Sequence, residues 1–356
     1  MHTKIEEHLN SVYNHLFPEN SKVIVALSGG VDSVVLLQTL KNSRPDLHII
    51  AAHCNHNLRE QSKEDEDFCK RLCEDNDIHF EVTDLDVVRF CSENKTGTEE
   101  GARILRHRFF EELKWTHNTD YLALGHHAND RAETIFFNLL RGTGLAGLSA
   151  MKRADNERGI YRPLLGLQKN DILGVAKLQN WNWVEDHTNH ESEYDRNWLR
   201  NVVFPLLGER RQGLVKILNR TAEQFDLIND FVELQAEKYI RDKSSCNSAG
   251  NFAFFDIADY LSEHKALQNA VMLRMWIDLY GSSSNFSNKI IKEFSKWINS
   301  DLSNGKSVEF GKSYRLVNRN GLLGVKPNDK TNSLDINDKL LSLYKIRDNK
   351  SGLSIR

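Results

Sequence analysis

The chain has 356 residues, of which 27% are charged and 40% are hydrophobic, and its formal net charge is −3. This balance is that of an ordinary soluble globular protein, and the length predicts two or three domains. No apolar run approaches the roughly 20 residues that span a bilayer, and the first ten residues lack the apolar core of a signal peptide. We therefore expect a cytoplasmic protein with no membrane partner. Five cysteines without a C-x-x-C pair exclude a disulfide framework and argue against a zinc ribbon.

Short apolar runs alternate with helical patterns over the first 142 residues. The runs that predict strands are 23–27, 48–54, 79–85 and 121–127, and the stretches that predict helices are 34–42, 60–75, 98–117 and 132–142. Strands that alternate with helices indicate an α/β fold, with a parallel sheet covered by helices on both faces. Cys69 and Cys73, four residues apart in a helical pattern, are expected to pack in the core.

The pattern changes near residue 205, where a smaller and mainly α-helical C-terminal domain is expected to follow. The predicted parts are an α/β domain at 1–212, a linker helix at 213–243, a C-terminal domain at 244–326 and a tail, or a truncated second C-terminal domain, at 327–356. Within the third part, Asn320-Gly321 lies between two apolar runs and predicts a β-hairpin.

The strongest chemical signal is SGGVDS, at residues 28–33 between the first predicted strand and its helix. Glycine lets the main chain approach a phosphate closely, and the N-terminus of a helix attracts anions. Asp32 beside a polyphosphate would repel it unless a cation lay between them, and Mg²⁺ prefers such oxygen ligands. The alternative is an ordinary glycine turn with a helix cap. The spacing is neither G-x-x-x-x-G-K-[ST] nor G-x-G-x-x-G, and it is the motif of the PP-loop ATP pyrophosphatases.

Further motifs follow in a fixed order. They are HCNHNLRE (53–60), GHHANDRAET (125–134), NLLRGTGLAGLSAM (138–151), YRPLLGL (161–167), WVEDHTN (183–189) and YDRNWLR (194–200). This series closely resembles the tRNA(Ile)-lysidine synthetase family. The resemblance covers residues 20–210 and continues more weakly to about residue 325.

The resemblance implies a two-step reaction. ATP adenylates the oxygen at carbon 2 of the wobble cytidine in a minor isoleucine tRNA with the anticodon CAU, and pyrophosphate is released. The ε-amine of free L-lysine then displaces AMP and gives lysidine, which changes codon reading from AUG to AUA. ATP and Mg²⁺ are the implied cofactors, and a homodimer is a further expectation.

Residue roles are carried over from the matching motifs. The implied ATP-binding residues are Ala26, Ser28, Gly29, Gly30, Val31, Asp32, Ser33 and His53, with Asp32 also on Mg²⁺. The implied catalytic residues are Asp32, His126, Asp130 and Arg200. The implied lysine- or tRNA-binding residues are Arg103, Arg106, Asn129, Arg141, Arg196 and Asn197. Residues 196–220 form a basic stretch, with six Lys or Arg side chains against the single acidic residue Glu209.

Two positions depart from the family's HHxDDQ pattern, because this chain has Asn129 where Asp is usual and Arg131 where Gln is usual. Asn keeps an oxygen acceptor but loses a charge, which predicts weaker binding of the metal or of the lysine ammonium. His107 also replaces a more usual tyrosine.

Three alternatives remain open on the sequence. Another PP-loop enzyme, a tRNA thiolase or an amidotransferase, would need paired cysteines or a glutaminase domain, and neither is visible. A metallohydrolase could use His53, His56, His126, His127 and Asp130 as ligands, but this leaves SGGVDS unexplained. A catalytically inactive tRNA-binding protein is conceivable because of Asn129, although Asp32, His126 and Asp130 are retained.

Overall fold

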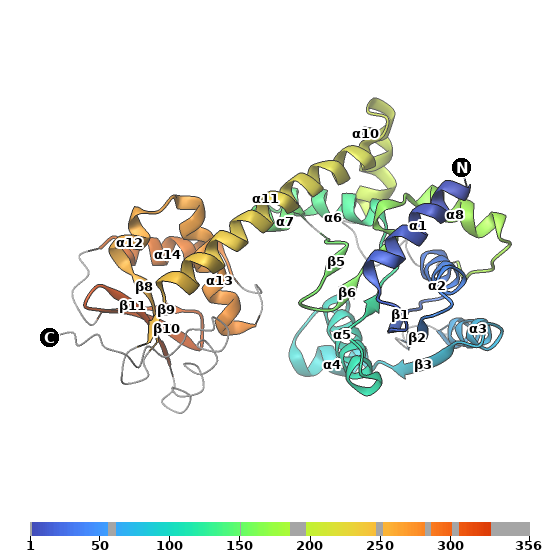
Figure 1. The fold of residues 1–356 in the computed structure, drawn as a ribbon, viewed down its shortest axis with the longest axis horizontal. Helices are drawn as coiled ribbons and strands as arrows, with labels where there is room; N and C mark the ends of the chain where they lie inside the picture. Colours follow the sequence, from blue (N-terminus) through green and yellow to red (C-terminus); the bar gives the residue numbers. More distant parts are fainter. Residues whose placement is uncertain are drawn as a thin grey trace. The chain divides into compact units, whose positions relative to one another are not determined.

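A computed structural model of the chain describes residues 2–55, 62–149, 151–185, 197–246, 252–281, 286–300 and 306–328. The chain divides into two compact units, residues 1–226 and 227–356, called here the N-terminal and C-terminal units. The border falls inside the long helix α11 (Leu214–Lys243), which occupies the range predicted for a linker helix (Figure 1).

A six-stranded sheet forms the centre of the N-terminal unit, in the order β3-β2-β1-β4-β6-β5. Its strands are β1 (Lys22–Ala26), β2 (His48–Asn55), β3 (His79–Asp84), β4 (Leu122–Ala123), β5 (Ala154–Asp155) and β6 (Ile160–Tyr161). Every pairing is parallel except that of β5 with β6. The predicted parallel α/β sheet is confirmed.

Helices flank this sheet (Figure 1). They are α1 (His2–Leu16), α2 (Val31–Ser43), α3 (Ser62–Glu74), α4 (Val87–Asn94), α5 (Thr98–His117), α6 (Ala128–Leu140), α7 (Leu145–Ser149), the 3₁₀ turn η1 (Pro163–Gly166), α8 (Lys169–Leu178), the π-helical turn η2 (Leu199–Val203) and α10 (Phe204–Arg210).

Alternate residues of β1 belong to two different hydrophobic clusters. Val23 and Val25 pack with α1, α2, α3 and α8, while Ile24 packs with Phe110 and Leu113 of α5. Successive side chains of a strand point to opposite faces, and all three β1 residues are fully buried. Both faces of the sheet are therefore covered, which explains why β1 reads as a continuous apolar run. Cys69 and Cys73 are fully buried in the first cluster, as predicted.

The fourth predicted strand, 121–127, is shorter in the structure, where β4 has two residues. Its backbone still bonds both neighbours, because Ile24 N donates to Tyr121 O and Leu124 N donates to Tyr161 O. The chain leaves the sheet after Leu124 because α6 begins at Ala128. The sequence pattern also gave no warning of α1, α4, α8, β5 and β6, which lie outside the predicted elements.

The C-terminal unit combines helices with an antiparallel sheet of order β7-β8-β11-β10-β9. Its elements are β7 (Ser245–Cys246), β8 (Phe252–Asp256), α12 (Ile257–Ser262), α13 (Lys265–Tyr280), α14 (Asn288–Ile298), β9 (Ser307–Phe310), β10 (Tyr314–Arg319) and β11 (Leu322–Pro327). The predicted hairpin is confirmed, since β10 and β11 pair around Asn320 and Gly321, and both turn residues have positive φ. A core of aromatic and Met side chains, including Trp276 and Phe294, joins the helices to the sheet.

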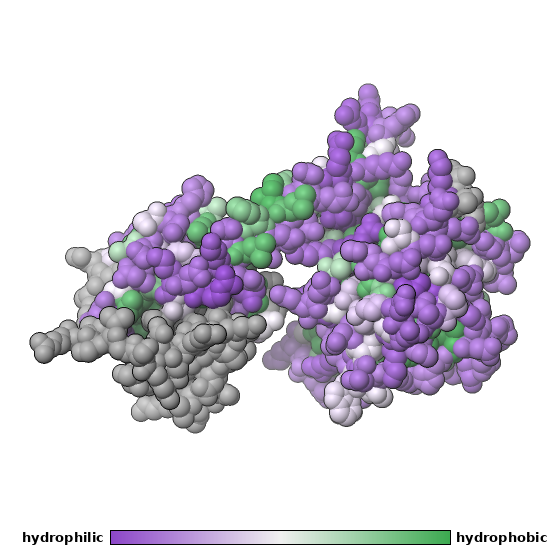
Figure 2. Space-filling view, in the orientation of Figure 1, coloured by the Kyte–Doolittle hydropathy of each residue, from purple (hydrophilic) through white to green (hydrophobic). Residues whose placement is uncertain are grey.

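The middle of α11 carries an exposed apolar surface, visible in Figure 2. Leu227, Phe231 and Leu234 are each 60–65% exposed, and their spacing places them on one side of the helix. Among the described residues, no helix is long and apolar enough to cross a membrane.

Leu37→Ala tests the core that supports the β1–α2 connection. Leu37 is fully buried in α2, so losing its side chain leaves a cavity and is expected to lower the free energy of unfolding by about 3 kcal/mol. Leu178→Ala is the matched control, because Leu178 is 60% exposed at the end of α8 and its loss is expected to cost less than about 0.5 kcal/mol. Urea denaturation followed by circular dichroism compares the two, and equal losses would contradict the prediction.

Candidate active site

The SGGVDS residues form a tight turn between β1 and α2. Gly29 has a φ of +86°, a conformation that favours glycine. A Cβ at this position would also lie 3.3 Å from Cys69 Sγ. Ser33 Oγ donates to Gly30 O at 2.9 Å, and its oxygen lies 3.2 Å from both the backbone N and the Oγ of Ser28. The serines therefore hold the turn in shape from within.

The first turn of α2 offers unpaired backbone donors. Gly30 is the N-cap residue and has no side chain that could cap the helix, and no hydrogen bond from the N–H groups of residues 31–33 to another described residue is found. The first N–H groups of a helix have no acceptor inside the helix and carry its positive dipole end. The start of α2 is therefore an anion-binding position, of the kind that holds phosphate groups.

Gly125, which follows β4, packs directly against the turn. A Cβ on Gly125 would lie 3.2 Å from the carbonyl carbon and oxygen of Asp32 and from Ser33 N. Glycine at this position brings the end of β4 close to the backbone of α2. The turn thus lies between β1 and β4, where the strand order of the sheet reverses and α/β proteins commonly bind ligands.

His53 supports the turn from the neighbouring strand. It is 4% exposed at the carboxyl end of β2, and its Nδ1 lies 2.8 Å from Leu27 O. Since a carbonyl oxygen only accepts, Nδ1 carries the hydrogen. His53, a predicted ATP-binding residue, thus contacts Leu27, the residue just before Ser28. Ala26, another predicted ATP-binding residue, is the last residue of β1 and precedes Leu27.

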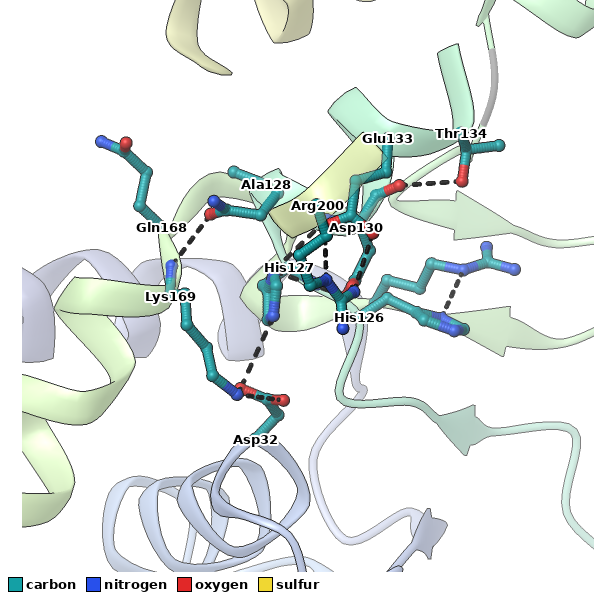
Figure 3. A network of polar contacts seen from close by, with 12 residues as sticks. Asp32, His126, His127, Ala128, Asp130, Glu133, Thr134, Gln168, Lys169 and Arg200 are labelled. Atoms are coloured by element: carbon teal, nitrogen blue, oxygen red, sulfur yellow. Dashed lines mark hydrogen bonds and ion pairs between the residues drawn. The ribbon is translucent and has the colours of Figure 1, made fainter. Parts of the chain in front are cut away.

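The start of α6 faces the turn (Figure 3). His127 is the N-cap residue, and it forms a reciprocal capping pair with Asp130, whose Oδ2 accepts from His127 N at 2.9 Å. The other imidazole nitrogen of His127, Nε2, lies 3.7 Å from Asp32 Oδ1. His127 thereby connects two of the predicted catalytic carboxylates, Asp32 and Asp130.

Lys169 is a site residue that the sequence analysis missed. Its Nζ lies 2.8 Å and 2.7 Å from the two carboxylate oxygens of Asp32 (Figure 3). Its backbone N donates to Asn129 Oδ1 at 3.0 Å, so Asn129 caps the first residue of α8. The one available signal was its position two residues after the YRPLLGL motif.

Arg200 forms a bidentate ion pair with Glu133. Its Nε and Nη2 lie 2.8 Å and 2.7 Å from the two carboxylate oxygens, and Nη2 also lies 3.4 Å from Asp130 Oδ1. The Glu133 side chain is 6% exposed. The hydrogen bonds with Glu133 are the main reason why the pKa of Arg200 lies above its usual value. The YDRNWLR motif is thus joined to α6 by a charged and directional pair.

His126 lies beside Arg162, another residue that the sequence analysis missed. Arg162 Nε donates to His126 Nδ1 at 3.3 Å. Burial, followed by the positive charge of Arg162, lowers the pKa of His126 to about 4. At neutral pH this imidazole is uncharged. Because arginine only donates, Nδ1 is the acceptor and Nε2 carries the hydrogen.

Three more of the predicted lysine- or tRNA-binding residues, Arg103, Arg106 and Arg141, have their described contacts outside this network. Arg103 pairs with Glu100 on the exposed face of α5, and Arg106, also exposed, adds to the positive charge around His126. Arg141 ends α6, with its guanidinium 3.8 Å from the ring centre of Phe137. Asn197 is half-buried just before η2, and Arg196 lies outside the described residues.

Arg131, the second departure from HHxDDQ, pairs with a carboxylate of α11. It is 5% exposed, and its Nη1 lies 3.7 Å from Glu223 Oε1 on α11. Burial lowers its pKa, while the negative charge of Glu223 opposes this effect. The extra cation is therefore balanced by Glu223.

The metallohydrolase alternative is not supported by the geometry of its candidate ligands. His127 Nδ1 accepts from Asp130 N, and His126 Nδ1 accepts from Arg162. Within the described part of the chain, no three of His53, His126, His127 and Asp130 bring ligand atoms within 4.8 Å of one another. His56 lies outside the described residues.

Arg200→Ala is expected to destabilise the N-terminal unit, because it leaves the Glu133 carboxylate buried without its partner. The expected loss in the free energy of unfolding is about 1–3 kcal/mol, and adding Glu133→Gln is expected to recover part of it. Arg89→Ala is the control, since Arg89 and Glu93 form an exposed pair that contributes less than about 1 kcal/mol. Denaturant unfolding measures all three variants. No difference between Arg200→Ala and Arg89→Ala would refute the structural role.

His126 is expected to make stability depend on pH. Its folded pKa of about 4 lies below the ordinary histidine value of about 6.5. Between these values the unfolded chain binds a proton that the folded chain does not, so stability falls as the pH decreases through this window. His126→Gln removes this contribution. The stability advantage of the natural protein over the variant is therefore expected to shrink between pH 7.5 and pH 5, and a pH-independent difference would count against the assignment.

Comparisons with known proteins identify the family of the chain. The PP-loop domain family matches residues 1–207. A tRNA(Ile)-lysidine synthase of Clostridioides difficile is 33% identical over 269 residues, which cover 74% of this chain and 58% of the relative. Another, from Chlorobaculum tepidum, is 33% identical over 314 residues, covering 86% of this chain and 92% of the relative. The chain thus spans little more than half of the first relative and most of the second.

A solved structure shares the fold. The U34-tRNA thiolase NcsA from Methanococcus maripaludis, described with its 4Fe-4S cluster, has a TM-score of 0.54 and 17% identity, covering 62% of this chain and 78% of the thiolase. The SGGVDS turn, the Asp32 and Asp130 carboxylates and the extent of the sequence match lead to one conclusion: the chain belongs to the tRNA(Ile)-lysidine synthase family of PP-loop proteins.

Proposed function

We propose that the protein is an ATP-dependent ligase that joins lysine to carbon 2 of the wobble cytidine in the minor isoleucine tRNA. The observation that carries this proposal is the phosphate-binding turn at the start of α2, which meets Asp32, His127, Asp130 and Arg200 at the carboxyl ends of β1 and β4. Family membership favours this reaction over the thiolase and amidotransferase alternatives.

In the first step, the oxygen on carbon 2 of cytosine attacks the α-phosphorus of ATP. A phosphorus–oxygen bond forms to the base, and the bond to pyrophosphate breaks. The N–H groups of the first turn of α2 and the hydroxyl of Ser28 would hold the departing pyrophosphate. These donors are fixed before the reaction and need little reorganisation as negative charge develops, which is an efficient source of transition-state stabilisation.

Asp32 is the proposed ligand for Mg²⁺. The fit rests on its carboxylate, which lies in the turn, is 30% exposed and already pairs both oxygens with the ammonium of Lys169. A position that attracts one cation suits another, and Mg²⁺ is usually held by one or two carboxylates together with substrate phosphates. When bound, the ion would neutralise phosphate charge. Lys169 would then be released from Asp32 and would be close enough to reach a phosphate oxygen.

In the second step, the ε-amine of lysine attacks carbon 2 and AMP departs with the oxygen that it has gained. Asp130 is the proposed group that orients the lysine amine and accepts its proton. Its Oδ2 accepts a hydrogen bond from His127 N at 2.9 Å, whereas the closest described partner of Oδ1 is Arg200 Nη2, at 3.4 Å. Oδ1 is therefore the oxygen proposed to receive the amine. His126 stays neutral near pH 7, so we assign it a hydrogen bond from Nε2 to the transferring phosphate, and not proton abstraction.

The remaining roles concern the tRNA. Arg103, Arg106, Arg141, Arg196 and Asn197 are the proposed contacts with lysine or with the tRNA near its target base, and residues 244–326 are the proposed tRNA-recognition domain. Phosphate contacts position a nucleic acid and carry little sequence information, so the basic side chains would place the anticodon and the adenylation site would select the cytidine. A homodimer and a cytoplasmic location stay predictions.

A reconstituted reaction tests the proposal. Purified protein, Mg-ATP, lysine and a CAU-anticodon isoleucine tRNA transcript are incubated, and the digested nucleosides are analysed by mass spectrometry. We expect a cytidine carrying one lysine, and AMP and pyrophosphate in equal amounts. Asp32→Asn is expected to reduce the rate by at least about 100-fold, because it removes a charge that acts on the transferring group.

Asp75→Asn is the matched control, since Asp75 is exposed at the end of α3 and its loss is expected to leave the rate unchanged. An unmodified cytidine in a tRNA that binds well would overturn the proposal in favour of a binding protein. An adenylated cytidine that forms without lysine and is consumed when lysine is added would establish the order of the two steps.

A further inference from the structure

Two histidines and a glutamate meet at the amino-terminal side of the sheet, away from the site described above. His79 and Glu81 lie on β3, the strand at one end of the sheet, and His117 is the last residue of α5. The ATP-binding turn follows the carboxyl end of β1, whereas His79 begins β3. These three residues take no part in the proposed ligase reaction.

The possible ligand atoms of the three side chains point to a common position. His79 Nε2 and His117 Nε2 each lie 2.9 Å from the same oxygen, Glu81 Oε1. Their ligand atoms all lie within 4.8 Å of one another. Ligands about 2.0–2.1 Å from a tetrahedral zinc ion lie about 3.3 Å apart by geometry, so each of the two 2.9 Å distances from a histidine nitrogen to Glu81 Oε1 would lengthen by about 0.4 Å to admit an ion.

The backbone fixes the two parts of this cluster against each other. Residues i and i+2 of a strand share one face, which places His79 and Glu81 side by side. The end of α5 is tied to β1, because Lys22 Nζ donates to His117 O at 3.1 Å and Thr119 Oγ1 donates to Lys22 O at 2.6 Å. Little ordering is needed for the three groups to bind one ion together.

We propose that His79, Glu81 and His117 form a binding site for a borderline divalent cation, with Zn²⁺ as the natural occupant. Two imidazoles and one carboxylate are typical zinc ligands, whereas Mg²⁺ and Ca²⁺ prefer oxygen alone. The carboxylate supplies the negative charge that partly offsets that of the ion. The side chain of His79 is 59% exposed and that of His117 18%, so the ion enters from solvent and keeps a coordination position open.

Zinc in this position would link the end strand of the sheet to the last turn of α5. A ligand that binds only the folded state stabilises it in proportion to the logarithm of its concentration over its dissociation constant. The site therefore predicts stabilisation by zinc that does not depend on ATP, lysine or tRNA. It stands or falls separately from the proposed ligase activity.

Zinc titration of tag-free, chelator-treated protein at pH 7.5 is the test, with a chromophoric chelator as competitor. One equivalent of Zn²⁺ is expected to bind. His79→Ala and His117→Ala are each expected to weaken this binding by at least about tenfold. The melting temperature of the natural protein is expected to rise by at least about 2 °C with excess zinc, and this rise is expected to be lost in both variants.

His107→Ala is the matched control. His107 also lies on α5, faces one glutamate, Glu111, at 3.9 Å and is half-exposed, so its removal is expected to leave zinc binding unchanged. His79→Ala alters an exposed side chain and is expected to fold normally. Zinc binding of equal strength in the natural protein, His79→Ala and His117→Ala would overturn the site, as would the absence of any zinc binding at this pH.

Discussion

The N–H groups at the start of α2 are the constraint around which the N-terminal unit is arranged. A helix cannot satisfy its own first amides, and here the N-cap residue, Gly30, has no side chain that could cap them. The surrounding residues instead fix the shape of the turn, through Ser33 on Gly30 O, His53 on Leu27 O and Gly125 packed against the backbone of Asp32. An anion that binds there contacts a turn that is already ordered in the folded protein. Binding therefore does not carry the entropic cost of ordering the turn.

The charged side chains near this turn form a connected set of ion pairs. Lys169 and Arg200 stand against three carboxylates, those of Asp32, Asp130 and Glu133. Arg162 and Arg106 add positive charge beside His126, which also feels the negative charge of Asp130. Lys169 already neutralises Asp32 without nucleotide, and Mg²⁺ arriving with ATP would take over that role and free the ammonium for the phosphates. The Asp32 carboxylate would then have a cationic partner both without nucleotide, when it pairs with Lys169, and with Mg-ATP, when it pairs with Mg²⁺.

Local signals in the sequence predicted much of this fold, and contacts between distant residues were beyond their reach. SGGVDS, the helix at 98–117 and the Asn320-Gly321 hairpin depend on neighbouring residues, and all three are found in the structure. Lys169 lies 137 residues from Asp32, and Arg200 lies 67 residues from Glu133. Those pairs depend on the strand order and on where α8 and η2 meet α6, which periodicity along the chain does not encode. The length of the strand predicted at 121–127 was overestimated for a related reason, since the early start of α6 ends β4 after two residues.

Asn129 shows why a departure from a family pattern has to be judged by its contacts. The amide oxygen of Asn129 accepts from Lys169 N at the start of α8, a task that Asp would perform with the added attraction of a negative charge for a helix N-terminus. Replacing Asp by Asn therefore keeps the link that places Lys169 on Asp32, and it removes one negative charge from a site that must accept a triphosphate. The geometry of the two retained carboxylates, Asp32 and Asp130, does not depend on that charge, because Lys169, His127 and Arg200 hold them.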